Sequence, residues 1–277
     1  MTYLNEYREG VEYLREAGIT DAEWDARYLL EYICHTDRNT LYLHPEHQVS
    51  EQEHADYRRA LRLRHERIPL QHITGEQEFM GLSFRVNEHV LIPRQDTETL
   101  VEEVMRYLHD GMEILDMCTG SGCILLSLLH YSNGCTGTGV DLSEEALQVA
   151  RENGERLHLD ARWIQSDLFT KVDGKFDMIV SNPPYIQTDV IATLEPEVRD
   201  HEPMMALDGC ADGLEFYRRI ARDAGRHLKR GGMLFFEIGY DERDDVMRIM
   251  TESGYTDVTG VQDLAGHDRV VIGTHVK

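Results

Sequence analysis

Short apolar segments alternate with amphipathic segments from residue 112 to the end of the chain. Residues 112–117, 136–140, 161–165, 175–180 and 232–238 have the length and composition of strands. Helical spacing follows at 123–130, 143–155, 213–228 and 241–253, and two further short strands are expected near 255–261 and 269–274. Strands separated by helices usually pair in parallel and are covered on both faces. The pattern therefore predicts an α/β fold built on a largely parallel sheet.

The first 75 residues have a different pattern, typical of a small helical bundle. Thr20–Glu23 and Ser50–Glu53 each fit a capping box at a helix start, and apolar residues follow both at helical spacing. The role of such a bundle is either packing alone or recognition of a partner. We therefore expect three parts: a helical domain over 1–75, a linker over 76–95 and an α/β domain over 96–277.

The linker is expected to be a β-hairpin. Apolar residues alternate with other residues from Phe79 to Val86, Asn87–His89 indicates a turn, and Val90–Ile92 follows before Pro93. Beyond it, Asp96 is expected to cap the first helix of the α/β domain.

Charge argues against a nucleic-acid partner. The formal net charge is −23 over 277 residues, whereas binding to a phosphate backbone requires clustered Lys and Arg. One basic run exists, formed by Arg58, Arg59, Arg62, Arg64 and Arg67. It is either a solvated helix face or a surface for an acidic partner.

Other composition features point to a reduced, soluble protein. The five cysteines include no CxxC pair, so neither a disulfide framework nor a metal site is expected. No apolar run reaches the roughly 18 residues of a membrane span, and the N-terminus lacks the order of a signal peptide. We expect a cytoplasmic protein, and nothing in the sequence indicates more than a monomer.

A glycine loop, Asp116–Gly122, follows the first strand of the α/β domain. Gly120 and Gly122 allow the backbone to approach a ligand closely, with a helix N-terminus behind them. A dinucleotide fingerprint has a third glycine, but here that position is Leu125. The acid at Asp116 suits a ligand with a cationic amino group.

Two more acids follow the next strands. Asp141 is placed to accept hydrogen bonds from ribose hydroxyls, and Asp167 from an exocyclic adenine amine. Either acid alone could be a helix cap or a loop residue. Together with the glycine loop they describe a ligand with an ammonium group, a ribose and an adenine but no phosphate. S-adenosyl-L-methionine fits that description.

Ser181–Ile186 comes directly after the apolar run 176–180. It places an amide (Asn182), a proline turn and an aromatic ring (Tyr185) at a strand end, where open α/β sheets bind ligands. These groups suit the binding of a planar NH2 group, which is a methyl acceptor. Asn-Pro is also a common turn starter, so the segment alone leaves both interpretations open.

Several motifs give the chain a family resemblance. They are Arg67–Gly75, Val90–Glu98, Asn182–Ile186, Glu197–Asp200, Ala206–Gly209, Glu237–Tyr240 and Asp263–Val271. The chain resembles the class I S-adenosylmethionine-dependent methyltransferases, and more closely the peptide chain release factor glutamine methyltransferases. This implies a seven-stranded, mostly parallel sheet whose last strand is antiparallel. It also implies methylation of the glutamine amide in the Gly-Gly-Gln loop of release factors, with the N-terminal helices as the substrate-recognition domain.

The resemblance also implies roles for individual residues. Those implied to bind the cofactor are Asp116, Cys118, Thr119, Gly120, Ser121, Gly122, Asp141, Asp167, Leu168 and Asn182. The substrate is implied to meet Asn182, Pro183, Pro184 and Tyr185, of which Asn182, Pro183 and Tyr185 are catalytic. Cys118 stands where the family usually has glycine, so its side chain must point away from the methionine moiety. His267 stands where we expect arginine.

Two rival functions use the same features. A methyltransferase acting on adenine or guanine amines shares the Asn-Pro-Pro-Tyr motif, but it requires a basic surface or a base-flipping module. A non-catalytic scaffold would have no need of Asn182, Tyr185 and the three acids. The charge of −23 and the presence of these residues argue against both rivals.

Overall fold

The computed structural model describes residues 1–276, which form two compact units. One unit contains Met1–Glu76 together with Glu195–His201. The other contains Gln77–Leu194 and the described part of Glu202–Lys277. The domain prediction placed residues 1–75 alone in the N-terminal part, and the structure adds to it a short stretch that is distant in the sequence.

The N-terminal unit is a helical bundle around α1 (Tyr3–Glu16), α2 (Ala22–Ile33) and α4 (Glu51–His65). The shorter helices α3 (Arg38–Leu43), α5 (Leu70–Thr74) and α9 (Pro196–His201) complete it. Its core includes Leu14, Leu29, Leu30, Tyr57 and Leu61, all fully buried. The Tyr57 hydroxyl donates to the Ala26 carbonyl at 3.0 Å, so the largest buried side chain also satisfies its polar atom.

One of the two expected capping boxes is present. Ser50 caps α4, and the Glu53 side chain returns the hydrogen bond. The box at Thr20–Glu23 is wrong: α2 begins after Asp21, whose side chain makes no capping bond. Glu23 instead forms an ion pair with Arg15.

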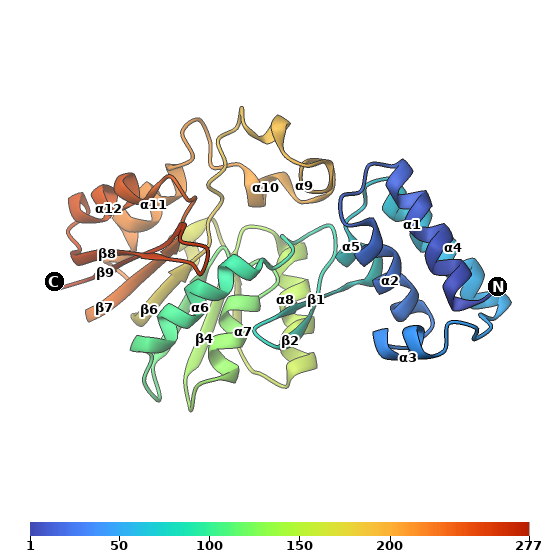
Figure 1. Cartoon of the computed structure of the whole chain (residues 1–277). Helices are drawn as coiled ribbons and strands as arrows, with labels where there is room; N and C mark the ends of the chain where they lie inside the picture. Colours follow the sequence, from blue (N-terminus) through green and yellow to red (C-terminus); the bar gives the residue numbers. More distant parts are fainter. Residues whose placement is uncertain (277) are drawn as a thin grey trace. The chain divides into compact units, whose positions relative to one another are not determined.

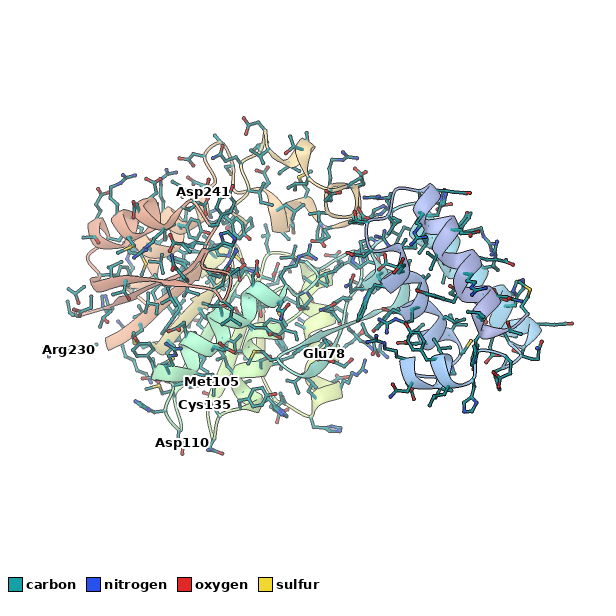
Figure 2. All side chains as sticks on the ribbon, viewed as in Figure 1. Glu78, Met105, Asp110, Cys135, Arg230 and Asp241 are labelled. Carbon is teal, nitrogen blue, oxygen red and sulfur yellow. The ribbon has the colours of Figure 1, made fainter. Side chains whose placement is uncertain are left out.

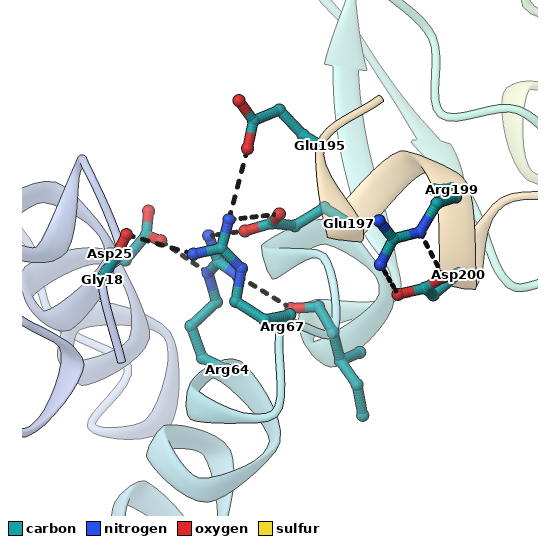
Figure 3. A network of polar contacts seen from close by, with 9 residues as sticks. Gly18, Asp25, Arg64, Arg67, Glu195, Glu197, Arg199 and Asp200 are labelled. Carbon is teal, nitrogen blue, oxygen red and sulfur yellow. Dashed lines mark hydrogen bonds and ion pairs between the residues drawn. The ribbon is translucent and has the colours of Figure 1, made fainter. Parts of the chain in front are cut away.

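A network of charges holds residues 195–201 within the N-terminal unit (Figure 3). Arg64 lies 2.6 Å from Asp25 and 2.8 Å from Glu197. Arg67 lies 2.8 Å from Glu197 and donates to the Gly18 carbonyl. The expectation of a solvated basic face is therefore wrong for Arg64, which is buried, and for the paired Arg67. Their acidic partners come from the same chain.

The linker forms a hairpin, but at a different position from the predicted one. β1 (Glu76–Phe79) and β2 (Leu82–Arg85) pair in a two-stranded sheet. Met80 and Gly81 join them with φ of +51° and +70°, as tight two-residue turns require. Val90–Ile92 is not a strand, and Asn87 and His89 form a separate turn closed by a 3.0 Å bond.

The second unit contains a seven-stranded sheet of order β5-β4-β3-β6-β7-β9-β8. The strands are β3 (Glu113–Met117), β4 (Thr136–Asp141), β5 (Arg162–Gln165), β6 (Phe176–Ser181), β7 (Leu228–Glu237), β8 (Thr256–Gln262) and β9 (Asp268–Thr274). β3 to β7 pair in parallel, and β9 is antiparallel to β7 and β8. This confirms the predicted sheet, including its antiparallel last strand.

Helices cover both faces of this sheet (Figure 1). On one face lie α6 (Gln95–Tyr107), α7 (Cys123–His130) and α8 (Glu144–Leu157). On the other lie α11 (Glu215–Ala224) and α12 (Arg243–Glu252). The connections include α10 (Met204–Leu207) and 3-10 turns at Leu168–Lys171 and Ile191–Thr193. Within residues 1–276, no helix combines the length and the apolarity of a membrane span.

The start of α6 differs from its prediction. Asp96 lies inside the first turn of the helix, and its N-cap is Arg94. The Asp96 carboxylate instead pairs with Arg269 of β9 at 3.1 Å. The helix therefore begins earlier than expected, and Asp96 links it to the sheet.

The candidate site residues gather at one of the two ends of the parallel strands. Asp110 and Cys135 precede β3 and β4, and Arg230 lies near the start of β7, so these three residues mark the amino ends of the strands (Figure 2). Asp241 follows the end of β7 and marks the carboxyl ends. Asn133 donates to Asp110 at 3.5 Å. The predicted site residues lie at or after the carboxyl ends of β3, β4, β5 and β6. They therefore meet at the opposite end of the strands from Asp110.

Candidate active site

A cavity of about 660 Å³ lies at the carboxyl edge of the parallel strands. Of the predicted site residues, its wall contains Cys118, Thr119, Gly120, Ser121, Asp141, Asp167, Leu168, Asn182 and Pro184. Asp116, Gly122, Pro183 and Tyr185 lie outside the wall. All residues that line the cavity belong to the second unit. The ends of four strands thus converge on one space.

The glycine loop is tied to the end of β4. Asp141 accepts hydrogen bonds from the backbone N–H groups of Gly120, at 2.9 Å, and Ser143, at 3.0 Å. Burial raises the pKa of this carboxyl, and the two backbone bonds oppose that effect. At Gly120, φ is +53° and no atom lies within 4 Å of the position that a Cβ would take. The loop therefore presents open backbone and a fixed carboxylate to the cavity.

Asp116 lies behind this loop and is fully buried. One of its oxygens accepts from the Thr119 hydroxyl at 2.5 Å. The other is buried and has no hydrogen-bond partner among the described residues. Burial raises the pKa of Asp116 to about 7. An unpaired buried oxygen of this kind suits a cationic or hydrogen-bonding partner.

Gly122 and Cys118 serve the loop in different ways. Gly122 has φ of +78°, and a Cβ there would lie 3.0 Å from Trp163 and 3.2 Å from Ala150. Gly122 therefore allows α7 to pack closely. Cys118 has φ of +63°, a conformation that favours glycine. Its side chain packs against the apolar cluster under α11, and burial raises the pKa of its thiol.

The third group of wall residues follows β5. Asp167 forms an ion pair with Arg219 at 2.6 Å, and about half of its side chain is exposed. Leu168 and Phe216 contribute apolar surface to the same wall. An acid beside apolar surface suits a flat, partly polar ring.

Asn182 follows β6 and faces the cavity together with Pro184. The end of β6 is fixed because the Ser181 hydroxyl donates to the Met117 carbonyl of β3 at 2.7 Å. Beyond it, the Ile186 N–H donates to Leu207, and the Gly209 N–H donates to Ile186. The segment that carries Asn182 is thus held on both sides by hydrogen bonds.

Tyr185 packs against the core cluster. Burial raises the pKa of its phenol, so the hydroxyl stays protonated near neutral pH. The predicted packing of its ring beside a bound amide stays a prediction.

The structure adds residues that the motif analysis did not assign. Arg94 and Thr97 line the cavity, and Arg94 pairs with the buried Glu202 at 2.6 Å. Glu237, at the end of β7, is buried; hydrogen bonding from Thr97 and Asn182 opposes the rise that burial causes in its pKa, and its Oε2 has no hydrogen-bond partner among the described residues. Their segments belong to the motifs that carry the family resemblance, but no spacing in the sequence shows that these residues meet. Thr97 lies 85 residues before Asn182, and Glu237 follows Asn182 only after several further helices.

Comparisons with known proteins agree with this arrangement. Residues 7–75 match the family model described as the PrmC N-terminal domain, and residues 95–195 match the methyltransferase small domain. The release factor glutamine methyltransferase of Agrobacterium fabrum is 42% identical, over 93% of this chain and 92% of the relative. That of Caulobacter vibrioides is 41% identical, over 99% of this chain and 96% of the relative.

Solved structures support the fold. The crystal structure of a methyltransferase from Pyrococcus furiosus aligns with a TM-score of 0.55 and 20% identity, and covers 72% of this chain and 91% of that one. A Thermus thermophilus rRNA methyltransferase, solved with AdoMet and guanosine, aligns with a TM-score of 0.50 and 16% identity, over 72% of this chain and 49% of that one. At these identities the likeness concerns the fold.

Proposed function

Because the chain belongs to the release factor glutamine methyltransferase family, we propose that it methylates the side-chain amide nitrogen of the glutamine in the Gly-Gly-Gln motif of release factors. The enzyme uses S-adenosyl-L-methionine. The observation that carries the proposal is that Asn182 and the loop Cys118–Ser121 line one cavity. An amide-binding group and a cofactor loop thus share one space.

The cavity wall fits this cofactor. It offers the carboxylates of Asp141 and Asp167, an open approach at Gly120 and apolar surface. Asp141 would bind the ribose hydroxyls, and Asp167 with Leu168 the adenine region. The loop Cys118–Gly122, with Asp116 behind it, would hold the amino-acid end. When bound, S-adenosyl-L-methionine supplies an activated methyl group.

The substrate amide would be held by two acceptors. A carboxamide nitrogen is a poor nucleophile because its lone pair is delocalised into the carbonyl. The Asn182 side-chain oxygen and the Pro183 carbonyl would each accept one N–H, with Pro184 and Tyr185 flanking the amide. The two prolines restrict φ and stiffen the segment. Positioning is then the main contribution, and well-oriented reactants gain about 7–11 kcal/mol in favourable cases.

The three parts of the chain have separate roles in this proposal. Residues 1–75 recognise the release factor, residues 76–95 act as a linker, and residues 96–277 catalyse the transfer. The match of residues 7–75 to the PrmC N-terminal domain supports the first role. We propose that the enzyme acts as a monomer in the cytoplasm, where release factors work, without direct binding to nucleic acid.

The deciding experiment combines the enzyme, isotope-labelled S-adenosyl-L-methionine and a purified release factor, followed by mass spectrometry of the Gly-Gly-Gln peptide. We expect one methyl group on that glutamine and none on a Gly-Gly-Ala control. The Asn182→Ala variant should retain cofactor binding by calorimetry and lose most single-turnover activity. Label on DNA or RNA with an unmodified release factor would favour the nucleic-acid alternative and contradict the proposal.

A further inference from the structure

The orientation of the Asn182 amide decides whether it can bind a substrate NH2 group. Its oxygen and nitrogen ends have almost the same shape but opposite hydrogen-bonding roles. Only the oxygen end accepts hydrogen bonds from a substrate amide. The groups behind Asn182 therefore determine which end faces the cavity.

Two oxygen-bearing side chains behind Asn182 select its nitrogen end. The Asn182 Nδ2 donates to the Thr97 hydroxyl oxygen at 3.4 Å. Hydrogen bonding from Thr97 and Asn182 opposes the rise that burial causes in the pKa of Glu237, and the buried Oε2 of Glu237 has no hydrogen-bond partner among the described residues. An ionised carboxylate can only accept, so the Thr97 hydroxyl donates to Glu237 and its oxygen remains available to Asn182. The Nδ2 end of Asn182 is then directed toward Thr97, and the oxygen end is left for the cavity.

The fold brings these three residues together. In the parallel pair of β6 and β7, Ser181 lies opposite Phe236. Asn182 and Glu237 each follow one of these paired residues, so they lie at the same level of the sheet. Thr97 comes from the first turn of α6. Glu237 is 2% exposed and lies outside the cavity wall. It can therefore affect the reaction only through the residues next to it.

We propose that Glu237 is a positioning residue, which acts together with Thr97 to hold the Asn182 side-chain oxygen toward the methyl-transfer cavity. The inference rests on the proposed function, since it takes Asn182 as the group that binds the substrate amide. A buried carboxylate is costly unless hydrogen bonds or charges compensate it. Arg269 acts on Glu237 electrostatically but forms its own ion pairs with Asp96 and Asp263.

The protonation state of Glu237 should matter for this role. Burial raises its pKa to about 7. A protonated Glu237 donates one hydrogen bond, which competes with the donors of Thr97 and Asn182. The side-chain amide of Asn182 can then flip, so that its nitrogen faces the cavity. The other groups that act on Glu237 are Asp96 of α6, Cys123 of α7, Tyr185, Tyr217 of α11 and Arg269 of β9. Burial raises the pKa of the thiol and of both phenols, so none of these three ionises near pH 7.

The first test compares Glu237→Gln with Glu242→Gln in single-turnover methylation of a release factor. Glu242 is a matched control: burial raises its pKa to about 7 as well, but its carboxylate accepts from Gly239 and Tyr217 and lies outside the cavity wall. In Glu237→Gln, the new side chain offers one acceptor oxygen where two donors need one each. We expect the rate of this variant at pH 8 to fall about 10- to 100-fold, the usual effect of weakened hydrogen bonds to a charged group, with an unchanged cofactor Kd.

The pH profile separates positioning from a structural role. For the wild type and Glu242→Gln, the rate at saturating cofactor should rise between pH 6 and pH 8. For Glu237→Gln this rise should disappear. Thr97→Val removes the bridging hydroxyl and keeps the shape of the side chain, so it should lower the rate with an unchanged cofactor Kd. This variant replaces Glu237→Gln as the test of the positioning role if Glu237→Gln does not fold.

A rescue experiment completes the test. Asn182→Asp places two carboxylates side by side and should be nearly inactive. In the double variant Asn182→Asp/Glu237→Gln, the new amide at position 237 donates to one oxygen of the new carboxylate at position 182. The other carboxylate oxygen is then left for the substrate, so the rate should recover about tenfold or more.

Two results would overturn the positioning role while wild-type methylation still supports the proposed function. One is the absence of rescue in the double variant. The other is an equal loss of rate in Glu237→Gln and Glu242→Gln. A wild-type enzyme that leaves the release factor unmodified would overturn both the positioning role and the proposed function.

Discussion

Asp141 shows at the scale of one residue how backbone geometry fixes the direction of a carboxylate. Its carboxylate is held from the protein side by the N–H groups of Gly120 and Ser143 and lines the cavity. Backbone donors cannot change rotamer, so these two bonds hold the carboxylate in one direction. The bond from Gly120 also ties the glycine loop to β4.

Replacement of Asp141 should therefore weaken cofactor binding. We expect Asp141→Ala to cost at least about 1.5–3 kcal/mol of binding free energy, the usual contribution of a hydrogen bond to a charged group. Isothermal titration with S-adenosyl-L-methionine measures this directly. The control is Asp160→Ala, which removes an exposed acid with the same change in net charge. A Kd equal to that of the control would remove Asp141 from the binding site.

The sequence predicts which loops form the site better than which side chains face it. Asp141, Asp167 and Asn182 follow successive parallel strands, so they were expected at the same end of the sheet. All three line one cavity. Gly122, Pro183 and Tyr185 lie in the same loops, and Asp116 lies at the end of β3, but all four are outside the wall. The direction of a loop side chain depends on local dihedral angles and packing, which no spacing reveals. Glu237 and Thr97 were missed because their partnership with Asn182 exists only after the sheet has formed.

At the scale of elements, α9 shows how a network of ion pairs can hold a helix that has no buried hydrophobic face. This six-residue helix has no buried residue of its own. Glu197 connects it to Arg64 and Arg67. Burial opposes the ionisation of Glu197, but its hydrogen bonds with Arg64, Arg67 and the backbone outweigh this effect and lower its pKa.

Loss of this connection should release the segment locally. We expect Glu197→Gln to lower the local stability of residues 195–201 by about 1–3 kcal/mol, because Arg64 and Arg67 lose their shared partner. Hydrogen exchange resolved by mass spectrometry should show faster exchange there and unchanged exchange in β3 and β6. Asp200→Asn is the control, since its pair with Arg199 is exposed and such pairs contribute little. Equal exchange in both variants would contradict the role of Glu197.

The predicted elements agree with the observed ones to within a few residues wherever the pattern is long. Most strands and helices after residue 112 were placed correctly, since buried strands and amphipathic helices differ in period. The hairpin was misplaced because Met80-Gly81 lacks the usual Asn-Gly or Asp-Gly signal. α9 and α10 are too short to show any periodicity, so they were not predicted.

At the scale of the whole molecule, buried acids determine how stability changes with pH. Burial raises the pKa values of Asp116, Glu237 and Glu242 to about 7, whereas in an unfolded chain they are near about 4. The folded state then binds more protons, and its free energy of unfolding falls as pH rises from about 4.5 to about 7. Asp200 and Asp212 act in the opposite sense, because hydrogen bonds from arginine lower their pKa values.

The melting temperature should therefore be highest on the acidic side of neutrality, at about pH 5. Glu242→Gln removes one of the buried acids, so its melting temperature relative to wild type should increase by roughly 2–8 °C between pH 5 and pH 8. Glu252→Gln, which replaces an exposed acid at the end of α12, should show a constant difference. Scanning calorimetry across this range checks both. A parallel response of the two variants would show that Glu242 ionises normally in the folded state.

The membership of residues 195–201 in the N-terminal unit has a consequence for dissecting the enzyme. A cut after Glu76 does not separate the two units into complete pieces. The N-terminal fragment would expose Arg64 and Arg67 without Glu195 and Glu197, and the C-terminal fragment would carry an orphaned acidic insert between β6 and α11. Each fragment studied alone would therefore lack part of the N-terminal unit. Mixing the two fragments and measuring whether activity returns becomes the informative assay.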